Sequence, residues 1–215
     1  MPQRKAAADA DLAAFYPIVP DSAWAKRIVP LGVKTLQLRL KDVSGEAVRR
    51  EIIDTLDVCV PHGCQLIVND HWREAISAGA DYVHLGQEDL AAADLPTIKA
   101  AGVRLGVSTH SAEELDVALQ AEPDYVALGP LFETKLKAMR WAPHGLAPIA
   151  TWRARIGALP LVGIAGITPE RAPDVLRAGA DSVAVITDFL THPRPEERIE
   201  TWLALNLEQH VGAAC

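Results

Sequence analysis

Three polar side chains alternate with leucines in the segment Gln37-Leu38-Arg39-Leu40-Lys41. Successive side chains of an extended strand point to opposite faces, so Gln37, Arg39 and Lys41 share one face. Buried charges are costly unless they are paired. This face therefore needs either nearby aspartates, in an internal salt-bridge network, or an anionic ligand. We favour an anion or diphosphate site, in which Arg39 offers a planar fork and Lys41 a point charge.

Asn69, Asp70 and Asp89 form a second polar group further along the chain. Mg²⁺ prefers oxygen ligands and commonly bridges phosphates, so two carboxylates near a diphosphate-binding face suit this ion. An aspartate that follows a strand can instead cap the next helix. Because the basic segment is expected to lie beside them, we interpret Asp70 and Asp89 as metal ligands.

The loop 129–145 carries several cations, among them Lys135 and Lys137, and is longer than a simple connection. Long loops beside a site are often lids, and a solvated basic loop is the alternative. Gly166 would let a phosphate approach the backbone closely. His84 and His110 lie near the same region, but we assign neither of them a role in proton transfer.

These residues stand at the ends of short apolar segments that alternate with amphipathic or alanine-rich stretches. Such alternation indicates βαβ units and a parallel sheet. Eight strands are predicted, at Phe15–Val19, Thr35–Leu40, Gln65–Asn69, Tyr82–Leu85, Arg104–Ser108, Tyr125–Leu128, Leu161–Ile164 and Ser182–Ile186. Eight units in a chain of this length predict an α/β protein with a single (β/α)₈ TIM barrel, whose active site lies at the carboxyl ends of the strands. An open doubly wound sheet is the alternative, but no Gly-x-Gly-x-x-Gly follows the first strand.

The junctions between the predicted elements support this alternation. Ala78-Gly79-Ala80-Asp81 and Ala178-Gly179-Ala180-Asp181 are near-copies in which a helix ends at glycine and aspartate precedes a strand. The run Ser111-Ala112-Glu113-Glu114 predicts a capping box. Thr168-Pro169 predicts a capped helix with proline at its first position.

The composition is that of an ordinary globular protein, with 49% hydrophobic and 23% charged residues. We expect one domain over 1–215, with flexible tails at 1–12 and 208–215. The net charge of −7 argues against a nucleic-acid partner. The first residues lack the apolar region of a signal peptide, and no apolar run approaches the ~20 residues that span a bilayer. We therefore expect a cytoplasmic protein with small-molecule partners and no membrane partner.

Taken together, the motifs resemble those of the thiamine phosphate synthase family from about residue 15 to 205. Each motif is weak alone, but their order and their positions at strand ends are specific. The matching runs are Gln37-x-Arg39-x-Lys41, Asn69-Asp70, His84-Leu85-Gly86-Gln87-x-Asp89, Gly106-x-Ser108-x-His110, Gly129-Pro130-x-Phe132-x-Thr134-x-x-Lys137, Gly163-Ile164-x-Gly166-Ile167 and Ile186-Thr187.

The family joins a hydroxymethylpyrimidine diphosphate to a thiazole phosphate and releases thiamine phosphate and diphosphate in a dissociative substitution. The resemblance implies that Mg²⁺ binds Asp70 and Asp89, and that Arg39, Lys41 and Lys137 act on the departing diphosphate. For the pyrimidine diphosphate it implies contacts from Gln37, Leu38, Arg39, Leu40, Lys41, Asn69, Ser108 and Lys137. For the thiazole phosphate it implies contacts from Thr134, Lys135, Leu136, Gly166, Ile186 and Thr187.

The chain departs from the family pattern at two positions. Leu136 stands where the family often has a second threonine, and Ala165-Gly166 replaces a pair of glycines. Two other functions are compatible with parts of the pattern: a thiazole tautomerase of the same superfamily, and a ligand sensor that keeps the pocket without turnover. A tautomerase needs no diphosphate or metal residues, so their presence favours the synthase. The oligomeric state stays open.

Overall fold

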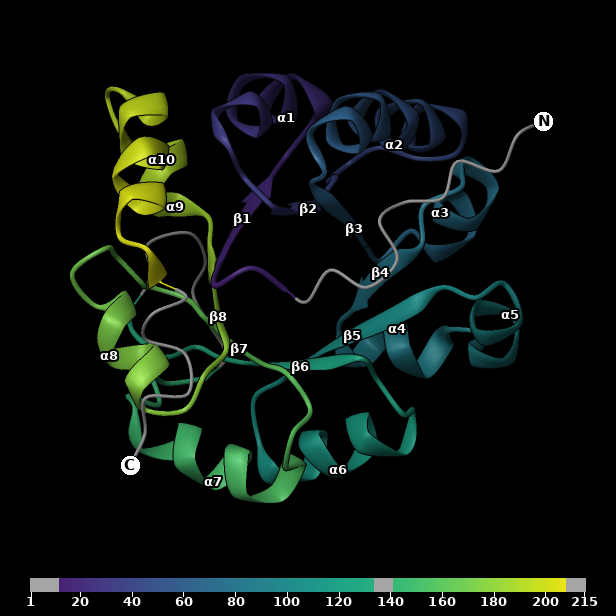
Figure 1. Ribbon diagram of the computed structural model, residues 1–215. Coiled ribbons are helices and arrows are strands. Elements are labelled where there is room, and N and C mark those ends of the chain that lie inside the picture. The colour runs from purple at the N-terminus through teal and green to yellow at the C-terminus, as the bar shows by residue number, and fades with distance from the viewer. Residues whose placement is uncertain (1–11, 134–140, 208–215) are drawn as a thin grey trace.

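Eight parallel strands close into a barrel in sequence order, β1 to β8. The computed structural model describes residues 12–133 and 141–207, and Figure 1 shows its helices around the ring of strands. The strands are β1 Phe15–Val19, β2 Thr35–Leu38, β3 Gln65–Asn69, β4 Tyr82–Leu85, β5 Arg104–Thr109, β6 Tyr125–Leu128, β7 Leu161–Ile164 and β8 Ser182–Val185. The predicted single (β/α)₈ barrel is confirmed.

The α-helices cover the outer face of this barrel. None of the helices in the described ranges is long and apolar enough to cross a membrane. They are α1 Ser22–Ile28, α2 Glu46–Cys59, α3 Trp72–Ala78, α4 Gln87–Ala92, α5 Leu95–Ala100, α6 Ala112–Gln120, α7 Ala147–Ile156, α8 Ala172–Arg177, α9 Thr187–Leu190 and α10 Pro195–Ala204. Two short 3₁₀ turns, η1 Val29–Leu31 and η2 Val60–His62, follow α1 and α2.

The prediction that β2 continues to Leu40 is wrong, because the strand ends at Leu38. The backbone N–H of Arg39 still bonds to the carbonyl of Val19, the last residue of β1, at 2.8 Å. Beyond that point β1 offers no further partner, and Asp42 turns the chain with a φ of 56°. The alternation therefore holds for the strand itself, whereas Arg39 and Lys41 lie in the loop that follows it.

Two other strand ends differ by one residue from the prediction. β5 extends to Thr109 because its ladder with β6 continues to the pair Thr109 and Leu128. β8 ends at Val185, since Ile186 leaves the extended conformation with φ −123° and ψ −74° and precedes α9. Both differences fall at the end of the barrel where the predicted site lies.

The predicted capping box before α6 is half formed. The Ser111 side chain accepts the N–H of Glu114 at 3.3 Å, as an N-cap should. The carboxylate of Glu114 does not return to Ser111 but accepts the backbone N–H of His110 at 2.8 Å. This bond still satisfies a donor at the helix start, one residue earlier than in a capping box.

The prediction that Thr168-Pro169 starts a helix is wrong, because α8 begins at Ala172. The backbone carbonyl of Thr168 accepts the N–H groups of Arg171 and Ala172, at 3.0 and 2.9 Å. Residues 168–171 therefore form a turn that leads into the helix.

The two repeated junctions lie at the amino ends of the strands, on the side of the barrel opposite the predicted site. Gly79 and Gly179 both have positive φ, which glycine adopts without a steric cost. Asp181 accepts the backbone N–H of Leu161 at 2.7 Å and pairs with Arg153. Asp181 thus joins the starts of β7 and β8 and contributes to the stability of the barrel.

Tight packing fills the inside of the barrel. Tyr16, Tyr82 and Tyr125 point inward and are almost fully buried. Gly106 on β5 makes room for one of them, because a Cβ atom there would lie 2.1 Å from Cε1 of Tyr125. The barrel interior is thus a packed core with several hydroxyl groups inside it.

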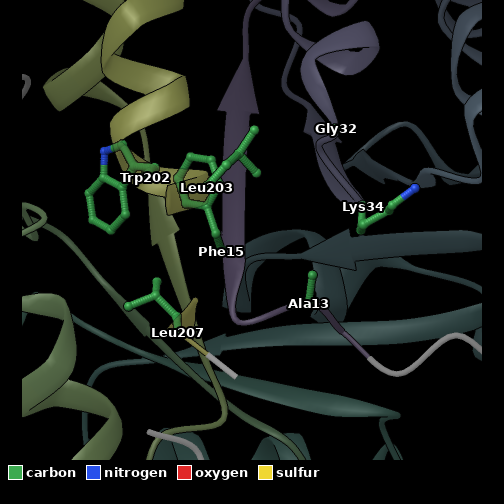
Figure 2. Close-up of a pocket in the computed structure, with 7 residues that line it drawn as sticks. All are labelled: Ala13, Phe15, Gly32, Lys34, Trp202, Leu203 and Leu207. Carbon is green, nitrogen blue, oxygen red and sulfur yellow. The ribbon is translucent and has the colours of Figure 1, made fainter. Parts of the chain in front are cut away.

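A small cavity of about 120 Å³ lies at the amino ends of β1 and β2 (Figure 2). Its described walls are largely apolar, and the wall residue Lys34 donates to the carbonyl of His62 at 3.2 Å. The wall residues are Ala13, Phe15, Gly32, Lys34, Trp202, Leu203 and Leu207. This cavity is on the opposite side from the carboxyl ends, where barrel active sites lie.

Candidate active site

The predicted metal ligands face one another beyond the carboxyl ends of β3 and β4. Asp70 directly follows β3, and Asp89 lies in the first turn of α4. The pKa of Asp70 is raised to about 6, chiefly by burial; the negative charge of Asp89 and a hydrogen bond between the two carboxyl groups contribute to this rise, and Arg39 opposes it. Two carboxyl groups this close repel each other when both are ionised, so the pair favours a shared proton or a bound cation.

Neither carboxylate occupies a helix-cap position. His71 is the N-cap of α3 and Gly86 is the N-cap of α4, without a capping side chain in either case. Asp70 instead has a positive φ of 63°, an uncommon conformation for a residue with a side chain. The side-chain amide of Asn69 donates to the carboxylate of Asp70. The backbone N–H of Asp70 donates to the carbonyl of His84 at 2.9 Å. The position of the Asp70 side chain is therefore set by Asn69 and His84, and not by capping of the helix that follows.

The residues present fit a magnesium ion that takes its remaining ligands from waters and from the phosphate oxygens of a substrate. Among the described residues no group of three or more His, Cys, Asp or Glu side chains gathers to hold a metal. Mg²⁺ is usually held by one or two carboxylates together with waters and phosphate oxygens. Asp70 and Asp89 match that donor set.

The two cations that follow β2 lie in different environments. Arg39 is half-buried and Lys41 is exposed. Arg39 is close enough to Asp70 to lower the pKa of that carboxyl group. Within 12–133 and 141–207, neither cation forms an ion pair with an acidic side chain. This speaks against the internal salt-bridge network as the reason for their presence.

A chain of hydrogen bonds crosses the barrel interior between Gln37 and Ser108. The Gln37 amide donates to the Tyr16 hydroxyl at 2.6 Å, and the hydroxyls of Tyr16 and Tyr125 are 2.9 Å apart. The Tyr125 hydroxyl lies 2.6 Å from Nδ1 of His84, and Nε2 of His84 lies 2.7 Å from Oγ of Ser108. Two predicted substrate residues on opposite parts of the barrel are thus connected through three buried side chains.

All three linking side chains are electrically neutral. Burial, with a smaller contribution from the charge of Arg39, lowers the pKa of His84 to about 3. Burial also raises the pKa values of Tyr16 and Tyr125 well above their usual range. A neutral imidazole has one donor and one acceptor nitrogen, so His84 orients its two hydroxyl partners without adding charge.

Sequence reasoning missed Tyr16 and Tyr125 and left His84 without a role. A signal was present in the alternation within the strands. Tyr16 and Ile18 share the inward face of β1, and Tyr125 and Ala127 share that of β6. An inward tyrosine in a barrel requires a partner for its hydroxyl, and that requirement points to other inward polar residues.

The predicted phosphate residues follow the adjacent strands β7 and β8. Gly166 has a φ of 65°, and a Cβ atom there would lie 2.4 Å from the carbonyl oxygen of Glu133. Only glycine fits at this position. Ala165 also has a positive φ, of 80°, which a second glycine would adopt without strain. After the end of β8, Thr187 is the first residue of α9.

Four predicted site residues lie outside the described residues: Thr134, Lys135, Leu136 and Lys137. The two interpretations of their loop, a lid over the site or a solvated basic loop, therefore stay predictions. At the far end of the loop, the ring of Trp141 stacks on that of His110, with centroids 6.0 Å apart. This contact joins the loop to the segment after β5. His110 thus has a packing role, and its ring also bonds to Glu114 at 2.8 Å.

Comparison with known proteins gives consistent matches. The family model described as thiamine monophosphate synthase matches residues 16–189. A thiamine-phosphate synthase of Rhizobium etli is 56% identical over 190 residues, which are 88% of this chain and 93% of that protein. One from Salmonella choleraesuis is 49% identical over 173 residues, which are 80% of this chain and 82% of that protein.

The fold matches a solved structure as well. Thiamine phosphate pyrophosphorylase from Pyrococcus furiosus superimposes with a TM-score of 0.79, over 94% of this chain and 98% of that chain. At 23% sequence identity, this likeness shows the shared barrel and no more. The family-model match and the identity to the two bacterial relatives carry the stronger conclusion: this chain belongs to the thiamine-phosphate synthase family.

Proposed function

We propose that the chain condenses 4-amino-2-methyl-5-(diphosphooxymethyl)pyrimidine with 4-methyl-5-(2-phosphooxyethyl)thiazole, giving thiamine phosphate and diphosphate. The observation that carries this proposal is the facing pair Asp70 and Asp89 beside Arg39, at the carboxyl ends of the strands. A diphosphate that leaves needs charge stabilisation more than it needs a strong base. This arrangement offers that stabilisation in a chain of the matching family.

Departure of the diphosphate is the step that the charged residues support. In the proposal, Arg39 and Lys41 bind its oxygens from the β2 side, and Lys137 binds them from the loop. Asp70 and Asp89 would hold Mg²⁺, which supplies charge neutralisation for the diphosphate when bound. The raised pKa of Asp70 supports this assignment, because a cation relieves the repulsion between the two carboxylates.

The pyrimidine is assigned to Gln37, Asn69 and Ser108, which are uncharged. The neutral hydrogen-bonded chain through His84 fixes the positions of Gln37 and Ser108 before substrate binds. Fixed donors and acceptors cost little reorganisation during the reaction. Leu38 and Leu40 are buried, so their contribution to the pyrimidine diphosphate site would come from the backbone.

The thiazole phosphate is assigned to Gly166, Ile186 and Thr187 at the ends of β7 and β8. Barrels commonly bind phosphate at these two strand ends. From the sequence, the segment 134–136 would add contacts to the same substrate. Binding the two substrates on one barrel face holds the thiazole nitrogen near the reacting carbon, which supplies the orientation that a two-substrate reaction needs.

One assay separates this proposal from the tautomerase and sensor alternatives. The protein is incubated with both substrates and Mg²⁺, and thiamine phosphate and diphosphate are followed together. We expect equal amounts of the two products, and none when either substrate is omitted. A tautomerase would convert a thiazole tautomer without the pyrimidine substrate. A sensor would bind thiazole phosphate without forming product. Tautomer conversion or binding in the absence of thiamine phosphate formation would contradict the proposal.

A further inference from the structure

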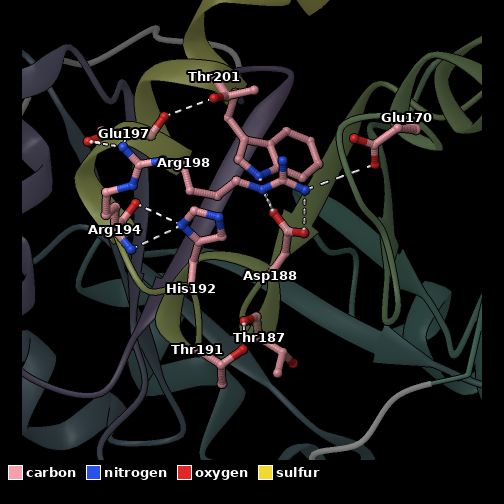
Figure 3. Close-up of polar contacts among 10 residues, drawn as sticks. Glu170, Thr187, Asp188, Thr191, His192, Arg194, Glu197, Arg198 and Thr201 are labelled. Carbon is pink, nitrogen blue, oxygen red and sulfur yellow. Dashed lines mark hydrogen bonds and ion pairs between the residues drawn. The ribbon is translucent and has the colours of Figure 1, made fainter.

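Behind the end of β8, two side chains of α10 hold the carboxylate of Asp188 (Figure 3). Arg198 donates from Nε and Nη2 to the two carboxylate oxygens, each at 2.8 Å. Trp202 donates from Nε1 to Oδ2 of Asp188, also at 2.8 Å. The side chains of Arg198 and Asp188 are only 19% and 12% exposed. A two-point, charge-assisted contact of this kind is strong and fixes geometry.

The donors of this contact sit on a rigidly packed helix. Trp202 is 1% exposed, and its ring stacks on that of Phe15 in β1 with centroids 4.9 Å apart. Ile199, next to Arg198, is fully buried. Because α10 is anchored to the barrel by these apolar contacts, it is Arg198 that fixes Asp188 in place.

The acceptor lies in a much weaker element. α9 has only four residues, and Ile186 before it is not helical. Phe189 is fully buried against Trp24 of α1, with ring centroids 6.0 Å apart, so α9 stays attached to the barrel without the ion pair. The ion pair therefore acts on the first turn of α9, next to Thr187.

We propose that Arg198 is a positioning residue for the thiazole phosphate: through the carboxylate of Asp188 it fixes Ile186 and Thr187 at the end of β8. This inference rests on the proposed function, which assigns those two residues to that phosphate.

A second acidic neighbour of Arg198, Glu170, contributes little to holding the Arg198 side chain. Glu170, in the turn before α8, lies 4.0 Å from Nη2 of Arg198 and is 73% exposed. Exposed ion pairs contribute little free energy because solvent and salt screen them. The inference is therefore restricted to the end of β8.

The test measures both substrates separately in Arg198→Gln, Arg198→Lys and Asp188→Asn. We expect Arg198→Gln to raise KM and Kd for thiazole phosphate about tenfold, with KM for the pyrimidine diphosphate within about twofold of the parent protein. The KM and Kd of Arg198→Lys for thiazole phosphate should lie between those of the parent protein and Arg198→Gln, because lysine keeps the charge and loses the two-point geometry. Calorimetric binding of thiazole phosphate alone supplies a readout that needs no turnover.

Arg153→Gln is the matched control. It removes the ion pair of Arg153 with Asp181, which joins the amino ends of the same two strands, β7 and β8. It should lower the melting temperature and leave both KM values unchanged. A purely structural role for Arg198 would give the same pattern, and that pattern in Arg198→Gln would overturn the inference.

The remaining outcomes distinguish a failure of the positioning role of Arg198 from a failure of the proposed function. If Arg198→Gln does not fold, Asp188→Asn is decisive, since it keeps an acceptor for Trp202 and removes the charge. An unchanged Kd for thiazole phosphate in Asp188→Asn would refute the positioning role. If the parent protein binds thiazole phosphate but forms no thiamine phosphate, the proposed function fails, whereas weaker binding in the variants would still support the positioning role.

Discussion

The Nε2 atom of His84 lies 2.7 Å from the hydroxyl oxygen of Ser108 inside the barrel. The histidine is buried and uncharged, with a pKa lowered to about 3. It therefore fixes the direction of a hydroxyl that we assign to substrate binding. Because burial keeps this imidazole neutral, the stability of the protein should depend on pH in a way that can be measured.

We expect His84 to lower the free energy of unfolding as the pH falls. The unfolded chain takes up a proton at the ordinary histidine pKa of 6.5, whereas folded His84 does so only near 3. Stabilisation by neutral His84 is thus complete above the unfolded value and is lost as pH falls toward the folded one. From about pH 7 to about pH 5 this amounts to about 2 kcal/mol. Urea unfolding at both pH values measures it.

His84→Gln provides the comparison for that measurement. The change in the free energy of unfolding between the two pH values should differ from that of the parent protein by about 2 kcal/mol in His84→Gln, whereas His62→Gln, at an exposed position, should match the parent protein. An equal pH dependence in His84→Gln and the parent protein would show that His84 is not held neutral by burial.

Gly106→Ala should disrupt the interior chain, because its Cβ would lie 2.1 Å from the Tyr125 ring. Overpacking of a core costs about 1–3 kcal/mol, and displacement of Tyr125 would also reduce activity. In a Tyr125→Leu background the same substitution should cost much less, because the clashing ring is absent. Urea unfolding of the four proteins gives the coupling energy. Equal costs in both backgrounds would contradict the packing account.

Asp70→Ala should lower activity by at least about 100-fold, with partial rescue at high Mg²⁺. The reason is that one carboxylate alone holds the cation and its diphosphate weakly. The control is Asp116→Ala, which removes an exposed aspartate paired with Arg155. Initial rates over a Mg²⁺ series check both variants. Full activity of Asp70→Ala at low Mg²⁺ would remove Asp70 from the metal site.

Lys137→Ala should slow turnover more than it weakens thiazole binding. In the proposal, Lys137 acts on the diphosphate as it departs, so the interaction is strongest in the transition state. Steady-state kinetics with each substrate varied in turn would show a fall in kcat. A rise in KM for thiazole phosphate with an unchanged kcat would be incompatible with this role.

Much of the fold was predictable from the sequence because strand and helix patterns alternate strictly. β1, β3, β4, β6 and β7 have the predicted bounds. The end of β2 was not predictable, because it depends on where its neighbour β1 stops at Val19. The continued alternation of Arg39, Leu40 and Lys41 gave no sign of that tertiary limit.

The candidate site shows the same division. Asp70 and Asp89 could be paired from the sequence, since strand ends gather on one face of a barrel. The interior chain could not be traced, because hydrogen bonds between Tyr16, Tyr125 and His84 join strands far apart in the sequence. Arg198 gave no signal either, since its role depends on the packing of α10 against β1.

In the proposed function, Asp70 and Asp89 with Arg39 form a metal-dependent diphosphate site. Its most direct test is the affinity for the pyrimidine diphosphate, measured by calorimetry without thiazole phosphate, in the presence and absence of Mg²⁺. We predict that Mg²⁺ tightens binding at least about tenfold in the parent protein and has no such effect in the Asp70→Asn, Asp89→Asn double variant. An affinity that is equal with and without Mg²⁺, or a Mg²⁺ effect that survives in the double variant, would contradict the claim.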